Sequence, residues 1–234
     1  MRNTTYFLFL LVLGSAFAKA NSPDPCLAQN DRTVDLRPFD TVKVFDLITV
    51  NLVKSDTPKI VIKGRDADEV VFIEKEGTLK IRMETDMIFH GEDTFVYVYY
   101  TDLNVIDGNE GAQILTNELM DQTDLEIRVQ EGARVEAGLK VKNLELRAVT
   151  GGILELQGTS QYQHLTVNTG GIAENESLKS DHVKVKVQAG GEVEVYASKS
   201  VDISVRAGGD VTVYGNPSKR KKNRFLGGRI DFVD

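Results

Sequence analysis

Aliphatic residues recur at every second position along short segments of this chain, and turns that contain glycine separate the segments. In the most regular part, glycine pairs stand at 151–152, 170–171, 190–191 and 208–209, and weaker Gly-Ala copies stand at 111–112 and 132–133. The first glycines of these turns are 21, 19, 19, 20 and 18 residues apart. A period near 20 residues with β-type segments is typical of a solenoid in which each repeat forms one coil.

Aligning the repeats on the first glycine predicts which residues form the core. The residue five positions before it is always aliphatic, as is the residue three positions after it. These two columns are Ile106, Ile127, Leu146, Leu165, Val185, Ile203 and Ile114, Val135, Leu154, Ala173, Val193, Val211. Because alternate residues of a strand share a face, both columns should point inward while the polar columns between them face solvent.

The predicted coil therefore consists of a strand, a Gly-Gly corner, a second strand, a polar turn and a short third side. Glycine suits the corner because the chain must adopt φ values that a Cβ resists, and because stacked corners leave little room for side chains. The prediction is an all-β protein, a right-handed parallel β-helix with about 20 residues per coil.

The remaining segments divide a single domain, residues 34–234, into three parts. Residues 39–100 contain strand-like runs at 39–54, 59–63, 70–74, 78–83 and 95–100, with a turn or short helix at 64–69, and should form N-terminal coils or a cap. The regular repeats occupy 103–215. Residues 216–234 should form a basic turn and a strand that caps the open end. Ordered structure is expected to begin near Phe39.

The N-terminus has the pattern of a secretory signal peptide, predicted at residues 1–18. Arg2 supplies the positive charge, residues 6–13 (YFLFLLVL) form the apolar core, and Ala16 and Ala18 form an A-x-A cleavage site, with cleavage after Ala20 as the alternative. The apolar run is too short to span a bilayer, so no integral membrane protein is expected. Residues 19–33 should form a disordered leader. Its Cys26, the only cysteine, could be a free thiol, a lipid-attachment site or an interchain partner.

Charge and motifs restrict the function. The formal net charge of −7 argues against nucleic acid as a partner, because phosphate backbones require a basic surface. No cofactor is predicted, because the glycine pairs join strand to strand and open no helix that could hold a phosphate. The histidines, His90, His164 and His182, are scattered and form no zinc motif.

A column of glutamates is the sharpest candidate site, and it contains Glu136, Glu155, Glu174 and Glu194. Stacked coils would place these carboxylates about 4.8 Å apart. They could bind a hard cation such as calcium or act as a catalytic carboxylate pair on a glycan. Alternatively they are a solvated face whose charge is compensated by Arg128, Arg147, Lys184 and Lys186.

Two further groups are candidate ligand-binding residues. Tyr97 and Tyr99 share one face of a strand and could stack on sugar rings, although a half-buried sheet surface would look the same. A basic run could bind an acidic glycan, lipopolysaccharide or a partner protein, or could be a solvated tail. Its cations are Lys219, Arg220, Lys221, Lys222 and Arg224.

Four segments in this order resemble the putative auto-transporter adhesin, head GIN domain family. They are FDTVKVFDLITVNLVKSDTPKIVIKG, GTLKIRM, the Gly-Gly repeats and AGGDVTVYGNP, together covering about residues 34–217. The resemblance implies a right-handed parallel β-helix and an exported protein of Bacteroidetes-type bacteria. The family name implies adhesion, and it brings no catalytic residues that could be assigned here.

The leading hypothesis is an exported, non-enzymatic binding or adhesion module of the bacterial cell envelope, located in the periplasm, at the outer membrane or outside the cell. Its partner would be a glycan or an envelope or surface protein, and coils of two molecules could stack into a homo-oligomer. One alternative is a polysaccharide lyase or glycoside hydrolase with an outer groove, which rests on fold analogy. The other is a purely structural envelope protein.

Overall fold

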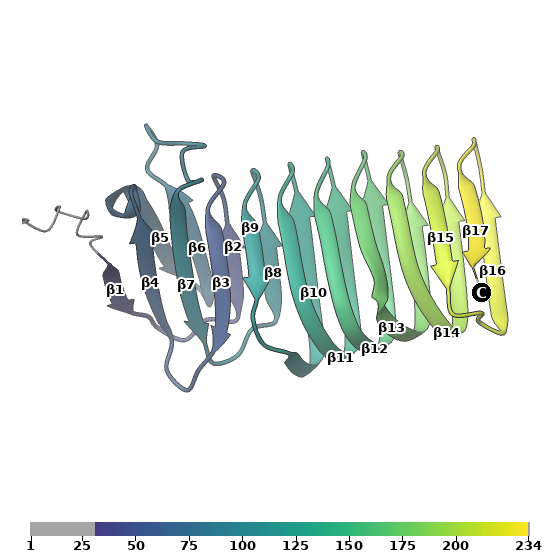
Figure 1. The fold of residues 1–234 in the computed structure, drawn as a ribbon, viewed down its shortest axis with the longest axis horizontal. Helices are drawn as coiled ribbons and strands as arrows, with labels where there is room; N and C mark the ends of the chain where they lie inside the picture. The colour runs from purple at the N-terminus through teal and green to yellow at the C-terminus, as the bar shows by residue number, and fades with distance from the viewer. Residues whose placement is uncertain (1–30, 234) are drawn as a thin grey trace, which may run out of the picture.

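A computed structural model describes residues 31–233, so the predicted signal peptide and residues 19–30 of the predicted leader lie outside the described residues. The chain forms a β-solenoid of about seven turns, with about 19 residues between stacked parallel bridges (Figure 1). The predicted all-β, parallel β-helix fold is confirmed. The described strands begin earlier than expected, at β1 (Arg32–Asp35) rather than near Phe39.

Long strands that bend through the coil build the regular part of the stack. They are β10 (Met120–Gln130), β11 (Arg134–Val149), β12 (Ile153–Asn168), β13 (Ile172–Val187) and β14 (Glu192–Val205). Each pairs in parallel with the next, and the β11–β12 pairing omits only Lys142 and Gln161, at the bend. In the coils of β11 to β14 the predicted polar turn and separate third side are therefore wrong, because the hydrogen-bonded ladder continues around this corner, whereas the coil before them has a turn at 117–119.

The bend divides the stack into two sheets that face each other across the core. The first sheet contains β7 (Thr94–Tyr100), β3 (Thr49–Lys54), β9 (Gln113–Thr116), the N-terminal halves of β11–β14, β15 (Asp210–Tyr214) and β17 (Arg229–Val233). The second sheet contains β6 (Thr78–Met83), β2 (Thr41–Val44), β8 (Val105–Gly108), the C-terminal halves of β10–β14 and β16 (Lys219–Arg224).

At the N-terminal end the coils do not stack in chain order. The β2–β3 coil lies between the β6–β7 coil and the β8–β9 coil. Beyond the β6–β7 coil, at the N-terminal end of the stack, the pairing becomes antiparallel. There β4 (Lys59–Gly64) pairs with β7, β5 (Val70–Lys75) pairs with β6, and β1 pairs with β4. The η1 turn (Ala67–Glu69) joins β4 to β5. No helix among residues 31–233 is long and apolar enough to cross a membrane.

The core is one continuous row of aliphatic side chains between the sheets. Every residue of the two predicted inward columns is buried, with at most 1% of its surface exposed. Stacked coils thus place an aliphatic side chain of one coil against the equivalent aliphatic side chain of the next. The burial of this apolar surface is the main favourable term in folding.

The two glycines of a corner have different roles. Gly151 and Gly170 have φ of 73° and 72°, and an added Cβ would meet open space, so glycine is favoured there by the left-handed backbone conformation. At Gly152 and Gly171, glycine is required instead because an added Cβ would clash with backbone atoms of the neighbouring coil. An added Cβ on Gly171 would lie 2.3 Å from the carbonyl oxygen of Ala148 in the coil below.

The basic run is a strand and not the predicted turn. Strand β16 pairs in parallel with β14 from Ser200↔Lys219 to Val205↔Arg224. Its alternation places Arg220, Lys222 and Arg224 in line with core positions of β14, and all six of its residues are exposed. The Arg220 guanidinium lies 4.4 Å from the ring centre of Phe232 on β17. Charges at inward positions are one way in which an edge coil avoids pairing with another edge.

Candidate functional site

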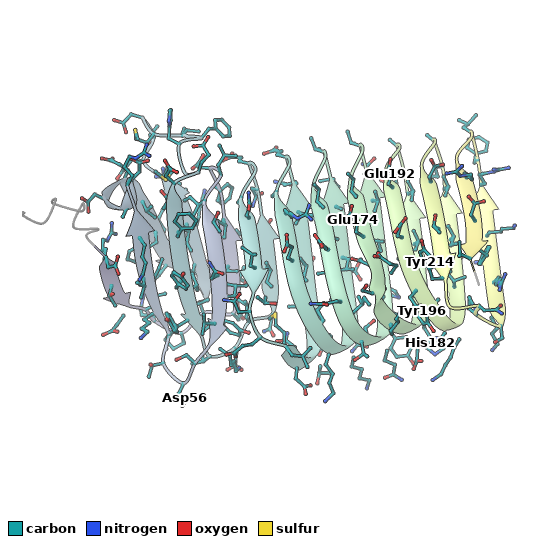
Figure 2. The ribbon with its side chains drawn as sticks, in the orientation of Figure 1. Asp56, Glu174, His182, Glu192, Tyr196 and Tyr214 are labelled. Carbon is teal, nitrogen blue, oxygen red and sulfur yellow. The ribbon has the colours of Figure 1, made fainter. Side chains whose placement is uncertain are left out.

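The glutamate column lies on the outer face of the first sheet. Glu136, Glu155, Glu174 and Glu194 are register partners on β11, β12, β13 and β14. They line a shallow groove of about 730 Å³ together with Glu176, Glu192, Asp210 and Arg229. Figure 2 places Glu174 and Glu192 over the upper half of neighbouring strands, with Tyr196 and Tyr214 lower on the stack. The predicted file of carboxylates is therefore present in the fold as one wall of a groove.

One arginine accounts for most of the charge compensation in this groove. The guanidinium of Arg134 donates a hydrogen bond of 2.9 Å to Glu136, contacts Glu155, and lies 3.9 Å from Glu174. The four cations expected to compensate the glutamates are on the second sheet instead, since Arg128, Arg147, Lys184 and Lys186 belong to the C-terminal halves of their strands. The signal that could have found Arg134 is its position, two residues before Glu136 and thus on the same face.

A bulge in β13 shapes the floor of the groove. The β12–β13 register shifts between Glu155 and Gly158, and the amide side chain of Asn175 turns inward to accept a hydrogen bond of 3.2 Å from the backbone of Leu156. The bulge brings Glu176 and Ser177 into the groove lining. It also explains the 20-residue spacing between Gly170 and Gly190, since the coil holds one residue more than the preceding coil, whose first glycines are 19 residues apart.

The groove does not form a metal centre among residues 31–233. No group of three or more His, Cys, Asp or Glu side chains in this part of the chain is arranged to hold a metal ion. Arg134 lies within ion-pairing distance of three of the four glutamates and so supplies positive charge in the place of a cation. Glu194 has no cation within ion-pairing distance among the described residues. The groove therefore presents an acidic, water-exposed surface.

Tyr97 and Tyr99 lie on the same outer face as the glutamates, at the other end of the first sheet. Tyr97 is in one cross-strand row with Asn51, Leu115 and Glu136. Three strand steps separate Tyr97 from Glu136, roughly 14 Å at about 4.8 Å per step.

Lysines of β4 cover the rings of Tyr97 and Tyr99. The ammonium of Lys63 lies 5.7 Å from the ring centre of Tyr97, and the ammonium of Lys59 lies 4.4 Å from the ring centre of Tyr99. Both rings are half-buried in these cation–π contacts.

The cations of the basic run divide between two environments. Lys219 and Lys221 point outward on the second sheet, beside Ser200 and Asp202, whereas Arg220, Lys222 and Arg224 occupy the inward positions of the last coil. The candidate residues named from the sequence thus do not converge on one site. The glutamates and tyrosines share one face, and the outward lysines lie on the opposite sheet.

The structure also brings together residues that the sequence left scattered. Tyr162 and His182 are register partners on β12 and β13, and their rings stack with centroids 5.1 Å apart. Both residues stand eight positions before the first glycine of their own corner, so reading that column would have paired them.

Comparison with known proteins identifies the family. The family model described as putative auto-transporter adhesin, head GIN domain, matches residues 38–217, which is more than half of the chain. No functionally curated protein matches.

Solved structures share the fold at low sequence identity. A putative adhesin from Bacteroides fragilis is 19% identical, with a TM-score of 0.81, over 89% of this chain and 99% of that one. A putative adhesin from Parabacteroides merdae is 14% identical, with a TM-score of 0.67, over 88% and 96% of the two chains. A putative lipid binding protein from Parabacteroides distasonis is 15% identical, with a TM-score of 0.68, over 88% and 97%.

At these identities the solved structures establish a shared architecture, and the family model establishes descent over most of the repeats and the N-terminal coils. The chain therefore belongs to the putative auto-transporter adhesin, head GIN domain family.

Proposed function

We propose that this protein is an exported, non-enzymatic module of the bacterial cell envelope that binds a repetitive surface ligand, either a glycan or an envelope or surface protein. The family description points to adhesion, and the predicted signal peptide at residues 1–18 points to export. The class of ligand is inferred from the side chains on the outer surface of the solenoid.

The observation that carries the proposal is the periodic arrangement of outward side chains. Residues of successive coils are register partners over four or more strands, as in the row from Leu115 through Glu136, Glu155 and Glu174 to Glu194. Such a row offers like groups about every 4.8 Å on a rigid support. A polymer with a short repeat can contact such a row at several points, and contacts that are linked in this way strengthen one another.

A direct test is binding of the chain without its first 18 residues to a glycan array and to intact bacterial and host cells. We expect concentration-dependent binding to at least one glycan class or cell surface. A shape-matched comparison uses the Glu155→Gln/Glu174→Gln double variant, which removes two charges from the groove and keeps its shape. The absence of binding to every glycan, protein and cell tested would argue for the purely structural alternative.

The same double variant separates binding from catalysis. A polysaccharide lyase or hydrolase that used the groove would cleave chains, and loss of either carboxylate would abolish cleavage. We expect no shortening of pectic, alginate or peptidoglycan-derived chains by the wild-type protein, measured by reducing-end and unsaturated-product assays. Cleavage that disappears in the Glu155→Gln/Glu174→Gln protein would overturn the non-enzymatic assignment.

A further inference from the structure

A second hollow lies on the opposite side of the coil from the acidic groove, on the outer face of the second sheet. Its volume is about 470 Å³, and its lining includes Tyr162, His164, His182, Lys184, Lys219 and Lys221. These residues form two cross-strand rows over β12, β13, β14 and β16. One row is Tyr162, His182, Ser200 and Lys219, and the next is His164, Lys184, Asp202 and Lys221.

The β12 side of the hollow is an aromatic platform. Tyr162 is 40% exposed, and its ring stacks on His182 at an interplanar angle of 15°. The Nδ1 atom of His182 is 2.8 Å from the hydroxyl oxygen of Ser200, which holds the imidazole in the stack. An exposed aromatic ring supported in this way can pack against the apolar face of a ligand ring at low entropic cost.

Lysines of β13 and β16 make the hollow cationic. Lys184 and Lys219 are exposed and have no ion-pair partner among residues 31–233, whereas Lys221 pairs with Asp202 at 2.9 Å. Lys186 extends the same charge one row further along β13. Two strand steps and two residues along the strand, roughly 12 Å, separate the backbones of Lys184 and Lys219, so their flexible side chains can reach one acidic group above Ser200.

The positive charge is notable because the chain as a whole carries a net charge of −7. General composition therefore does not explain a local group of lysines with one carboxylate among them. Unpaired ammonium groups beside an exposed ring suit a ligand that joins an anion to a ring with an apolar face.

We propose that this hollow binds one acidic sugar unit of an anionic polysaccharide. Lys184 and Lys219 bind its carboxylate or sulfate group, and the sugar ring packs against Tyr162. This proposal rests on the proposed binding function and names the chemical class of its ligand and the face that takes it.

Calorimetry and surface-based binding measurements on the chain without its first 18 residues test the proposal with three probes. These are polygalacturonate, which carries carboxylates, dextran sulfate, which carries sulfates, and neutral dextran. We expect one or both acidic polymers to bind, with affinity falling as salt is raised, and dextran not to bind. Preference for one acidic polymer identifies which acidic group the hollow takes, and equal binding of dextran would overturn the proposal.

Variants locate the binding face. Lys184→Glu/Lys219→Glu should weaken binding of the acidic polymer by about 10-fold or more, because two charge-assisted contacts become repulsive. Tyr162→Ala should weaken it less, by about 5-fold, in line with the loss of one stacking contact. The control is Lys75→Glu/Lys140→Glu, which makes the same charge change at exposed lysines outside the hollow and should leave affinity within about 2-fold. Circular dichroism of each variant checks that the fold is retained.

Equal losses in the control and in the hollow variants would show a general charge effect and would overturn the proposal. Cell or glycan binding that persists in full in Lys184→Glu/Lys219→Glu would also reject the hollow while the proposed binding function stands. Failure of the wild-type protein to bind any surface would reject the proposed function itself.

Discussion

The same coils present two chemically opposite faces. On the first sheet, β12, β13 and β14 carry Glu155, Glu174 and Glu194 in one row. On the second sheet, the C-terminal halves of the same strands carry the Tyr162–His182 stack and Lys184. The backbone is the same in both sheets, so the difference lies entirely in the outward positions. A solenoid can therefore vary each face independently, because the inward columns and the glycine corners, rather than the outward side chains, maintain the fold.

The charges of the two faces are also managed differently. In the acidic groove, Arg134 contacts three of the four glutamates of the column. In the basic hollow, one aspartate neutralises one lysine and leaves two lysines unpaired among the described residues. Internal pairing lowers the capacity of a surface to bind an outside charge. This difference favours the second sheet as the binding face for an ionic ligand.

The largest expected effect comes from breaking the corner that joins the two faces. Gly171→Ala would place a Cβ 2.3 Å from the carbonyl oxygen of Ala148, which belongs to the rigid backbone of the neighbouring coil. We expect the free energy of unfolding to fall by about 3 kcal/mol. Urea denaturation monitored by circular dichroism measures this change.

The matched control is the other glycine of the same corner. Gly170→Ala meets open space and is strained only by its φ of 72°, so it should cost about 1 kcal/mol. Equal costs for the two variants would contradict the separate roles assigned to the two glycines.

A smaller effect is expected at the C-terminal coil, where cations replace the aliphatic core. Arg220→Val/Lys222→Ile would turn these inward positions into an apolar edge beside Phe232. We expect self-association to strengthen by about 10-fold or more, equivalent to about 1.4 kcal/mol, measured by sedimentation velocity over a range of concentrations.

The outward residues of the same strand provide the control for self-association. Lys219→Ser/Lys221→Ser also removes two positive charges from β16 but exposes no apolar edge, so it should not change the sedimentation coefficient. Association in this control to the same extent would show that charge alone, and not the inward position, prevents stacking of coils.

Removing the cation from the acidic face should have a more modest effect. Arg134→Gln leaves Glu136, Glu155 and Glu174 facing one another without a counter-charge. We expect the free energy of unfolding to fall by about 1 kcal/mol at low ionic strength and by less in 1 M salt, because the groove is exposed to solvent. Arg147→Gln, on the second sheet, should change it by less than about 0.5 kcal/mol. A loss that is independent of salt would indicate a packing role for Arg134.

The smallest effect concerns a corner carboxyl between the two faces. Burial raises the pKa of Glu110, and the hydrogen bond to Asp46 and the charges of Asp46 and Glu131 raise it further. Asp46 is itself buried and accepts a hydrogen bond of 3.0 Å from the backbone of Met83. Because the pKa of Glu110 is higher in the folded state, its contribution to stability is full below the unfolded pKa and is lost as pH rises through the folded pKa.

Glu110→Gln should therefore raise the Tm at pH 7 and make little difference at a pH below the usual range of carboxyl groups. Thermal unfolding followed across this range measures the effect, and Glu76→Gln, at the exposed turn between β5 and β6, is the comparison. A Tm gain in Glu110→Gln that is the same at every pH would show that the effect does not come from titration.

Much of the fold followed from sequence periodicity, because each coil repeats the same local rule. The aliphatic columns, the corners and the glutamate file needed only the alternation of a strand and the spacing of the glycines. The glutamate file is where the sequence predicted it, but the cation that pairs with it is Arg134 and not one of the four predicted cations. Strand alternation alone places Arg134 on the same face as Glu136, but its contacts with Glu155 and Glu174 depend on how the coils stack.

The sequence by itself determined the coil length, the inward columns and the positions of the corners, because these depend on residues close together in the chain. Tertiary structure decided what depends on contacts between distant segments. It inserted the β2–β3 coil between β6–β7 and β8–β9, a pairing that no local pattern encodes. It also made a strand of the basic run, since β14 supplies the hydrogen-bonding edge that this composition alone would not predict. The basic hollow has the same origin, because stacking brings together side chains that are about 20 residues apart in the chain.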